Sequence, residues 1–196
     1  MTETADPNVS LTQPGAEIPY ELLPFPTCGR RRRDLATPMG EFFIDESAAL
    51  DEARFDDWLS LLAEGFIYQI PVPLLREDPK LPRYSARAML FEATKQVLAM
   101  KFGRVGLHYA WSDRPGAVIR HFISGVRVFE TDDPGCFRVD CNVLASWNRG
   151  RDESAFATAA RQDLIKDQGA HEYQILRRRV LLDTEVASQL QLSIIF

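Results

Sequence analysis

The sequence predicts an α+β domain in which N-terminal helices pack on one face of a curled antiparallel sheet. Helical periodicity is confined to the chain before residue 103, and four long strand-like segments follow it, with short turn signals between them. Helices gathered ahead of a meander of strands are typical of α+β domains rather than of alternating α/β folds. The length of 196 residues is that of one domain.

Residues 1–37 are predicted to form a proline-rich extended arm, and residues 38–196 the folded domain. Prolines prevent a helix in the arm and interrupt strand pairing; they are Pro7, Pro14, Pro19, Pro24 and Pro26. Because Leu22, Leu23 and Phe25 make this segment too apolar for a free tail, we expect it to press on the domain or on a partner. The basic run Arg30–Arg33 is either a solvated turn or a clamp on an acidic partner surface.

Two helices are predicted at the start of the domain, over residues 38–53 and 54–63. Pro38 opens the first, at a position where its missing N–H costs little. The second has apolar side chains at three- and four-residue spacing, the period of one helix face. These side chains are Phe55, Trp58, Leu59 and Leu62. Gly65 is expected to end this helix.

A strand and a third helix are predicted next. Residues 66–75 form the strand, in which Pro71 and Pro73 favour an edge position or a bulge. Residues 86–102 form the helix, because four apolar side chains share one side of it, and Gly103 ends it. The four are Leu90, Ala93, Val97 and Met100.

The remaining chain is predicted to be β-structure. Strands are expected over residues 118–131, 137–148, 155–166 and 171–182, with turns at 132–135, 148–153 and 167–169. The segment 137–148 alternates most cleanly between apolar and polar side chains. This period of two predicts a sheet with one buried face.

Charge and composition exclude several classes of function. The formal net charge is −5, which disfavours a nucleic-acid partner, since binding phosphates needs a positive face. No apolar run approaches the ~20 residues of a membrane span, and the N-terminus has no secretory signal pattern. Three cysteines do not make a disulfide framework. We therefore expect a cytoplasmic protein.

Metal and cofactor sites are not predicted in this chain. A Rieske cluster needs two Cys and two His, and a mononuclear iron site needs two His and a carboxylate. The three histidines, His108, His121 and His171, are not spaced as ligand pairs, and no Cys is followed closely by a His. We expect no metal, no cofactor and no catalytic residue here.

His121 is the one candidate for acid–base chemistry. It lies in the strand predicted over residues 118–131, and a hairpin could bring it near Asp140 on the next strand. A His–Asp pair in a pocket could transfer protons, as in a dehydratase or isomerase. A histidine among apolar neighbours is more often a structural group. A third reading is a module that binds a small ligand.

Two further features favour a subunit interface. Arg177, Arg178 and Arg179 stand in an apolar strand, where arginine is either solvated and ion-paired or in contact with another subunit. The last residues, Ile194, Ile195 and Phe196, would form an exposed apolar patch unless they dock. We expect the tail to dock as an edge strand or against a neighbouring subunit, with one of the three arginines binding the end of the chain.

Several motifs resemble the small, or β, subunits of Rieske-type aromatic-ring-hydroxylating dioxygenases. They are Arg54–Leu59 (RFDDWL), Tyr68–Pro71 (YQIP), Arg120–Val128 (RHFISGVRV), Arg177–Asp183 (RRRVLLD) and the ending Leu192–Phe196 (LSIIF). The resemblance runs from about residue 40 to residue 196. One departure is Gly125, which stands where this family usually has Asn.

The resemblance implies a cone-like fold of the nuclear-transport-factor or ketosteroid-isomerase type. It also implies a non-catalytic structural subunit that supports catalytic large subunits in a hexamer of three large and three small chains. The Rieske [2Fe–2S] cluster and the mononuclear iron are then expected in the large subunit, which would dihydroxylate an aromatic substrate.

Overall fold

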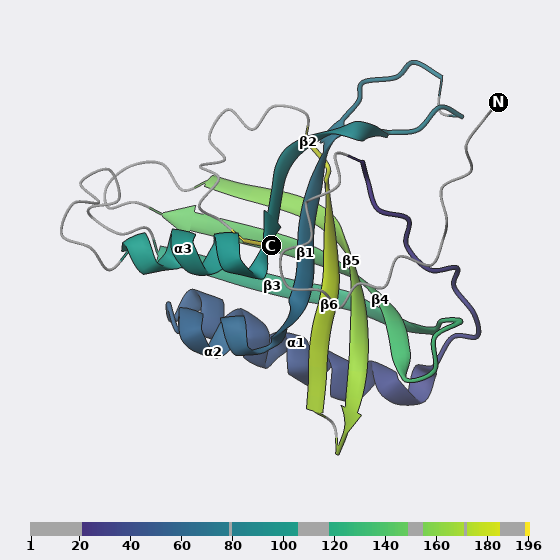
Figure 1. Cartoon of the computed structure of the whole chain (residues 1–196). Helices are drawn as coiled ribbons and strands as arrows, with labels where there is room; N and C mark the ends of the chain where they lie inside the picture. Colours follow the sequence, from purple (N-terminus) through teal and green to yellow (C-terminus); the bar gives the residue numbers. More distant parts are fainter. Residues whose placement is uncertain (1–20, 79, 106–117, 149–154, 171, 185–194) are drawn as a thin grey trace.

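The sheet and its helices form one curled α+β unit. A computed structural model describes residues 21–78, 80–105, 118–148, 155–170, 172–184 and 195–196. Six strands lie in the order β2-β1-β6-β5-β4-β3. Neighbouring strands are antiparallel except for the parallel pair β1 and β6. The sheet curls around the helices, which cover its inner face (Figure 1). The predicted fold class is confirmed.

Helices α1, Ala36–Asp51, and α2, Phe55–Ser60, open the domain. A short 3₁₀ turn, Arg33–Leu35, precedes α1, so the helix begins two residues before the predicted Pro38. Pro38 still lies in the first turn, where a proline is tolerated. One face of α1 packs on the sheet and buries six side chains. These are Met39, Phe43, Glu46, Ser47, Ala49 and Leu50.

Strand β1, Leu62–Pro73, begins earlier than predicted. Gly65 therefore lies inside the strand and does not end α2, which is a correction. The expectation for the prolines is confirmed, because the register with β2 shifts on both sides of Pro71. The parallel ladder with β6 ends at Gln69, so neither Pro71 nor Pro73 has to donate an N–H to it.

The helix predicted over residues 86–102 is wrong in its first half. Residues Tyr84–Thr94 form strand β2, and α3 spans only Lys95–Val105, with Gly103 inside it. The partner strand β1 decides this, because tertiary pairing overrides a local helical pattern. Among the side chains of α3 that the structure describes, Leu98 and Phe102, four residues apart, are buried, whereas the predicted Met100 is 61% exposed.

The four C-terminal strands are confirmed. They are β3, Val118–Glu130; β4, Cys136–Asn148; β5, Ala155–Gly169; and β6, Glu172–Leu182. In β4 the predicted alternation is present, since Phe137, Val139, Cys141, Val143 and Ala145 are buried. Strand β5 runs through the turn predicted at 167–169, and most of the turn predicted at 148–153 lies outside the described residues.

Gly125 forms a bulge in β3. Its φ is +64°, and the register with β4 shifts between Ser124 and Arg127. Glycine adopts this left-handed conformation at no steric cost, and asparagine is the other residue that often tolerates it. The departure from the family's Asn therefore preserves the conformation that the bulge needs.

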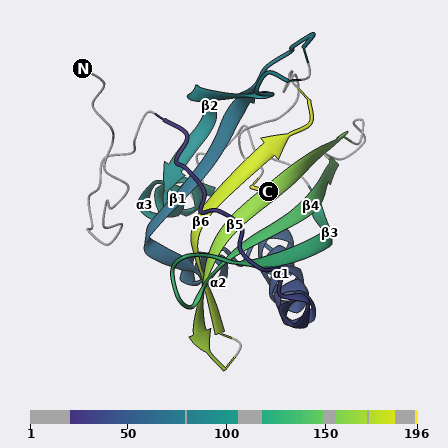
Figure 2. The same cartoon turned by 90° about the vertical axis from the view of Figure 1, so that its right-hand side faces the viewer.

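Residues 21–32 cross the outer face of the sheet, turned away from α1 (Figure 2). The segment begins beside β2, where Leu22 N–H donates to Ala86 O at 2.8 Å. It ends beside β3, where Arg32 N–H donates to Val128 O at 2.9 Å. This part of the arm presses on its own domain. The basic run pairs locally as well, because Arg30 Nη2 lies 2.8 Å from Glu130 Oε1.

Candidate functional site

Four charged side chains meet inside the fold, and we call them the interior charge cluster. They are Glu46 of α1, Arg161 and Asp163 of β5, and Arg178 of β6. Alternation along β5 turns residues 161 and 163 to the inner face, and Asp163 pairs in register with Arg178. All four side chains are at most 1% exposed.

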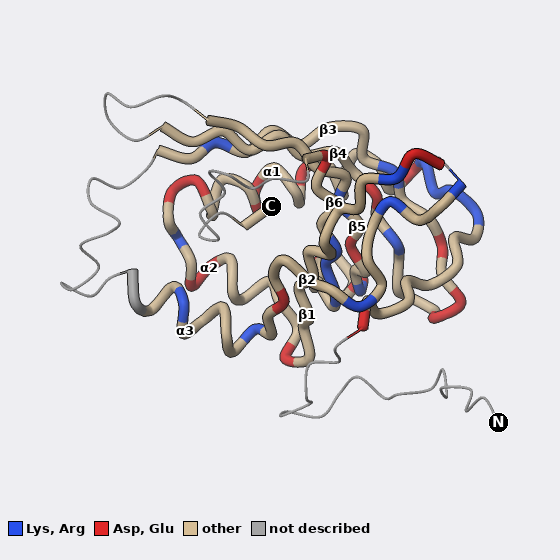
Figure 3. The backbone as a smooth tube through the Cα atoms, turned by 90° about the horizontal axis from the view of Figure 1, so that it is seen from above, with Lys and Arg blue, Asp and Glu red and all other residues tan. Residues whose placement is uncertain are grey.

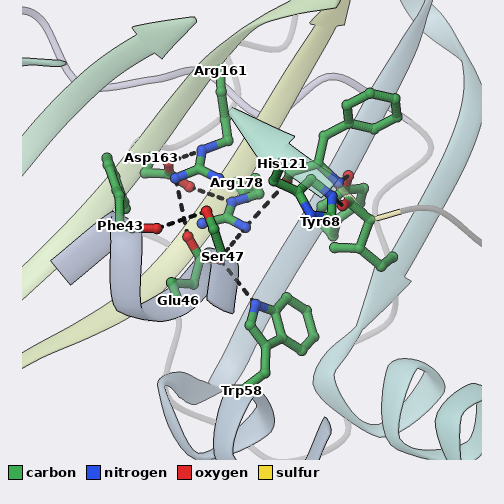
Figure 4. A network of polar contacts seen from close by, with 11 residues as sticks. Phe43, Glu46, Ser47, Trp58, Tyr68, His121, Arg161, Asp163 and Arg178 are labelled. Atoms are coloured by element: carbon green, nitrogen blue, oxygen red, sulfur yellow. Dashed lines mark hydrogen bonds and ion pairs between the residues drawn. The ribbon is translucent and has the colours of Figure 1, made fainter. Parts of the chain in front are cut away.

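Each carboxylate in the cluster bridges both guanidinium groups (Figure 4). Arg178 contacts Asp163 through Nε at 2.6 Å and Glu46 through Nη1 at 2.5 Å. Arg161 contacts Asp163 through Nε at 2.8 Å and Glu46 through Nη2 at 3.1 Å. Trp58 Nε1–H also donates to Glu46 Oε1 at 2.9 Å. The Arg161 guanidinium lies 4.2 Å from the centre of the Phe43 ring.

The cluster is electrically balanced, with two positive and two negative side chains. Burial alone would raise the pKa of Glu46, but the charges of Arg178 and Arg161 outweigh it and lower that pKa to about 2. Burial opposes the charge on Arg178, yet Asp163 and Glu46 raise its pKa above the ordinary value. At neutral pH, Glu46 and Arg178 stay charged, which suits a structural role better than proton transfer.

The last two residues of the chain also lie inside the fold, within the curl of the sheet (Figure 3). Ile195 is 3% exposed and Phe196 is 1% exposed. Arg178 Nη1 donates to Phe196 O at 3.1 Å, which confirms the expectation that one of the three arginines binds the end of the chain. The Phe196 N–H donates to the Tyr68 hydroxyl at 3.1 Å, and burial raises the pKa of Tyr68 to about 12.

His121 is bound on both sides, but not by Asp140. Its Nδ1 lies 2.7 Å from Asp51 Oδ1, and its Nε2 lies 2.7 Å from Ile195 O. The predicted pair with Asp140 is wrong, because the two side chains point to opposite faces of the sheet. His121 is in register with the buried Ala145, whereas Asp140 shares the outer face with Arg138, at 2.9 Å.

Arg177 and Arg179 point to the outer face, where they hold the arm. Arg177 Nη1 donates to Pro24 O at 2.7 Å, and Arg179 Nη2 donates to Leu23 O. The Phe25 ring lies 4.6 Å from the Arg179 guanidinium carbon. Burial and the neighbouring charges of Arg177 and Arg138 lower the pKa of Arg179 to about 10.

The subunit contact assigned to the three arginines and to residues 194–196 stays a prediction. Within the chain, Arg178, Ile195 and Phe196 are already buried in the interior of the domain. Ile194 lies outside the described residues, as do His108 and His171.

Metal ligands do not gather in the described part of the chain. No group of three or more His, Cys, Asp or Glu side chains there could hold a metal ion. Cys136 and Cys141 are buried on β4, and Cys28 is exposed on the arm. Among the described helices, none is long and apolar enough to cross a membrane.

Sequence reasoning missed Glu46, Asp51, Arg161 and Asp163. A signal was present in β5, because both charged residues occupy the alternating positions that Ala157 and Ala159 also share. Charged residues at the buried positions of a strand need partners of opposite charge inside the fold. For Glu46 and Asp51, the helix pattern alone gives no comparable signal.

Known proteins share both the fold and the sequence family. A structure of naphthalene 1,2-dioxygenase with indole bound in its active site matches with a TM-score of 0.70 and 19% identity, over 79% of this chain and 82% of that chain. The beta subunit of benzoate 1,2-dioxygenase from Burkholderia mallei matches with a TM-score of 0.58 and 19% identity, over 74% of this chain and 87% of that one. At such identities, these structures show the fold.

The family follows from the sequence match. The model of the ring hydroxylating beta subunit family matches residues 45–189, which is well over half of the chain. That range includes α2, all six strands and all four charged side chains of the interior charge cluster. The chain therefore belongs to the family of ring hydroxylating beta subunits.

Proposed function

We propose that this chain is a non-catalytic structural subunit, which supports the assembly of catalytic large subunits in an aromatic-ring-hydroxylating dioxygenase. Membership in the beta subunit family supports an oxygenase complex. The Rieske cluster, the mononuclear iron and the aromatic substrate would all belong to the large subunit. We expect three large and three small chains, as the resemblance implies, and a cytoplasmic location, which the sparse cysteines favour.

The observation that carries this proposal is the filled interior. Phe196 occupies the space enclosed by the sheet, and the interior charge cluster is neutralised by its own members. Both ring nitrogens of His121 are engaged by Asp51 and the tail. A catalytic acid or base must be able to reach a substrate proton, and His121 has no ring nitrogen left for that purpose.

The test is to co-produce the chain with its large subunit and to measure assembly and turnover separately. A His121→Gln variant should lower the yield or melting temperature of the complex, while turnover per assembled complex stays close to that of the wild type. Size exclusion with light scattering reports the assembly and the number of each chain. Arg127→Gln, an exposed residue on the same strand, is the matched control.

The opposite result would point to catalysis in this chain. If the His121→Gln complex assembled fully and melted like the wild type, yet lost turnover by about a thousandfold or more, His121 would have a catalytic role. Metal analysis gives a second check. One tightly bound iron per small chain, found in the chain purified without its partner, would also contradict a purely structural subunit.

A further inference from the structure

Three buried side chains bind the main chain of the last two residues. The Tyr68 hydroxyl accepts the Phe196 N–H at 3.1 Å, Arg178 Nη1 donates to Phe196 O at 3.1 Å, and His121 Nε2 lies 2.7 Å from Ile195 O. Tyr68 of β1 and Arg178 of β6 are register partners on adjacent strands, whereas His121 lies on β3 at the far edge of the sheet (Figure 4). Tyr68 and Arg178 are fully buried, and the His121 side chain is 4% exposed.

The positions of these three side chains are fixed by groups other than the tail. Arg178 is held by Asp163 and Glu46, and His121 by Asp51. Tyr68 is packed edge-on against Phe91, with 5.7 Å between ring centres. A receptor that is ordered before its ligand arrives loses less entropy on binding. The site therefore has the properties of a preformed binding site.

The tail supplies what such a site needs from a ligand. Its main-chain N–H and carbonyl groups find partners, which removes the penalty for burying them. Its two apolar side chains enter the hydrophobic core. None of these contacts depends on the covalent link between the tail and the rest of the chain.

We propose that Tyr68, His121 and Arg178 form a peptide-binding site, which takes the Ile-Phe ending of this chain and accepts the same ending supplied in trans. The ligand is a short apolar peptide that ends in Ile-Phe, recognised through its main chain by hydrogen bonds and through its side chains by burial. In the intact protein the site is occupied by its own tail. This proposal goes beyond the structural role and can be tested without enzymatic activity.

The test uses a full-length variant that combines Ile195→Gly with Phe196→Gly. We call it the emptied variant, because its tail no longer fills the site with apolar side chains. The ligand is a fluorescent peptide of sequence Leu-Ser-Ile-Ile-Phe. The emptied variant should melt below the wild type, bind the peptide saturably in fluorescence anisotropy, and regain melting temperature as peptide is added. The wild-type chain should bind the peptide at least about tenfold more weakly, because its site is filled. A Leu-Ser-Ile-Gly-Gly peptide is the ligand control.

The contacts are then tested in the emptied variant. Tyr68→Phe removes one hydrogen bond to the peptide and should weaken binding roughly three- to tenfold. The control is Phe156→Leu. The Phe156 side chain lies on the outer face and is 70% exposed, so this substitution should leave peptide binding unchanged. If the emptied variant does not fold alone, refolding from denaturant with the peptide should recover soluble native chain, and failure to recover it would count against the site.

Three results would overturn the proposal. The first is an emptied variant that melts like the wild type and does not bind the peptide. The second is equal binding by the wild type and the emptied variant, which would place the peptide elsewhere on the protein. The third is binding that does not distinguish the Ile-Phe peptide from the Gly-Gly peptide.

Discussion

His121 Nδ1 lies 2.7 Å from Asp51 Oδ1, and this contact joins the end of helix α1 to strand β3. The same carboxylate accepts the main-chain N–H of His121 through Oδ2 at 3.3 Å. The helix dipole disfavours a negative charge at the C-terminal end of a helix. Hydrogen-bond donors such as those of His121 offset this cost for Asp51. Because His121 also binds Ile195 O, one histidine connects helix, strand and tail.

Replacing Asp51 by Asn should destabilise the protein by about 1–3 kcal/mol, because a buried hydrogen bond to a charged group is lost. The Asp51 side chain is 11% exposed, so solvent replaces only part of the contact. The midpoint of chemical denaturation measures this change. Glu52→Gln is the control, since its side chain is 60% exposed and should shift the midpoint by less than about 0.5 kcal/mol. Equal effects of the two substitutions would contradict a special role for Asp51.

The pKa of Glu46 predicts a specific sensitivity to acid. Folding lowers this pKa from 4.5 to about 2, so the folded state binds a proton at Glu46 less readily than the unfolded chain does. The stabilisation of the fold by the ionised Glu46 side chain is therefore fully present above about pH 5 and is lost as the pH falls toward about 2. Unfolding free energies measured across this range should fall more steeply with acid for the wild type than for Glu46→Gln.

The Glu46→Gln chain should also be less stable at neutral pH, because two buried guanidinium groups then face a single carboxylate. Glu41→Gln, on the exposed side of the same helix, is the matched control and should keep the wild-type pH profile. If Glu46→Gln and the wild type lost stability in parallel below about pH 5, Glu46 would not be the group responsible.

Most of the fold could be predicted from the sequence, because the strands carry their own pattern. Alternation marked β4 almost residue by residue, and the turn at residues 132–135 fixed its start. The failure at β2 has a physical cause, since Leu90 and Ala93 are three residues apart, a spacing that fits one face of a helix but puts them on opposite faces of a strand. Pairing with β1 decided between the two, and no local window of sequence contains that partner.

The interior site was harder to predict, because its members are far apart in the chain. Glu46 and Arg178 are 132 residues apart, and only the folded sheet brings them together. His121 was recognised as a candidate, but its partner was misassigned. Asp140 lies on the adjacent strand, whereas Asp51 comes from a helix that crosses the inner face. Strand alternation alone argued against Asp140, which belongs to the polar face of β4.

The three cysteines should differ sharply in reactivity. Burial raises the pKa of both Cys136 and Cys141 to about 11, while Cys28 is exposed on the arm. Since the thiolate is the reactive form, a thiol reagent at about pH 8 should label one cysteine per native chain and three in denaturant. Cys28→Ser should abolish the native labelling. Fast labelling of two or three thiols in the folded protein would contradict the packing of β4.

Phe25 should anchor the arm to the outer face of the sheet. Its ring lies 4.6 Å from the Arg179 guanidinium carbon, 5.8 Å from that of Arg177 and 5.9 Å from that of Arg138. Phe25→Ala removes these cation–π contacts, each worth about 0.5–1 kcal/mol, together with the partial burial of the ring. We expect a loss of about 2 kcal/mol, and faster amide exchange at Leu22 and Leu23, whose main-chain atoms bind the domain.

The control for Phe25 is Phe156→Ala on the same outer face, because the Phe156 ring is 70% exposed and its removal should change stability little. Amide exchange distinguishes two explanations of any stability loss. If the arm alone detaches, exchange quickens at residues 22–32 while the β4 and β5 amides keep their protection. In that case Arg138, Arg177 and Arg179 lose the Phe25 ring as a partner but stay in place on the sheet. Uniform loss of protection across the sheet would show that Phe25 supports the whole domain, and unchanged exchange in the arm would show that Phe25 does not anchor it.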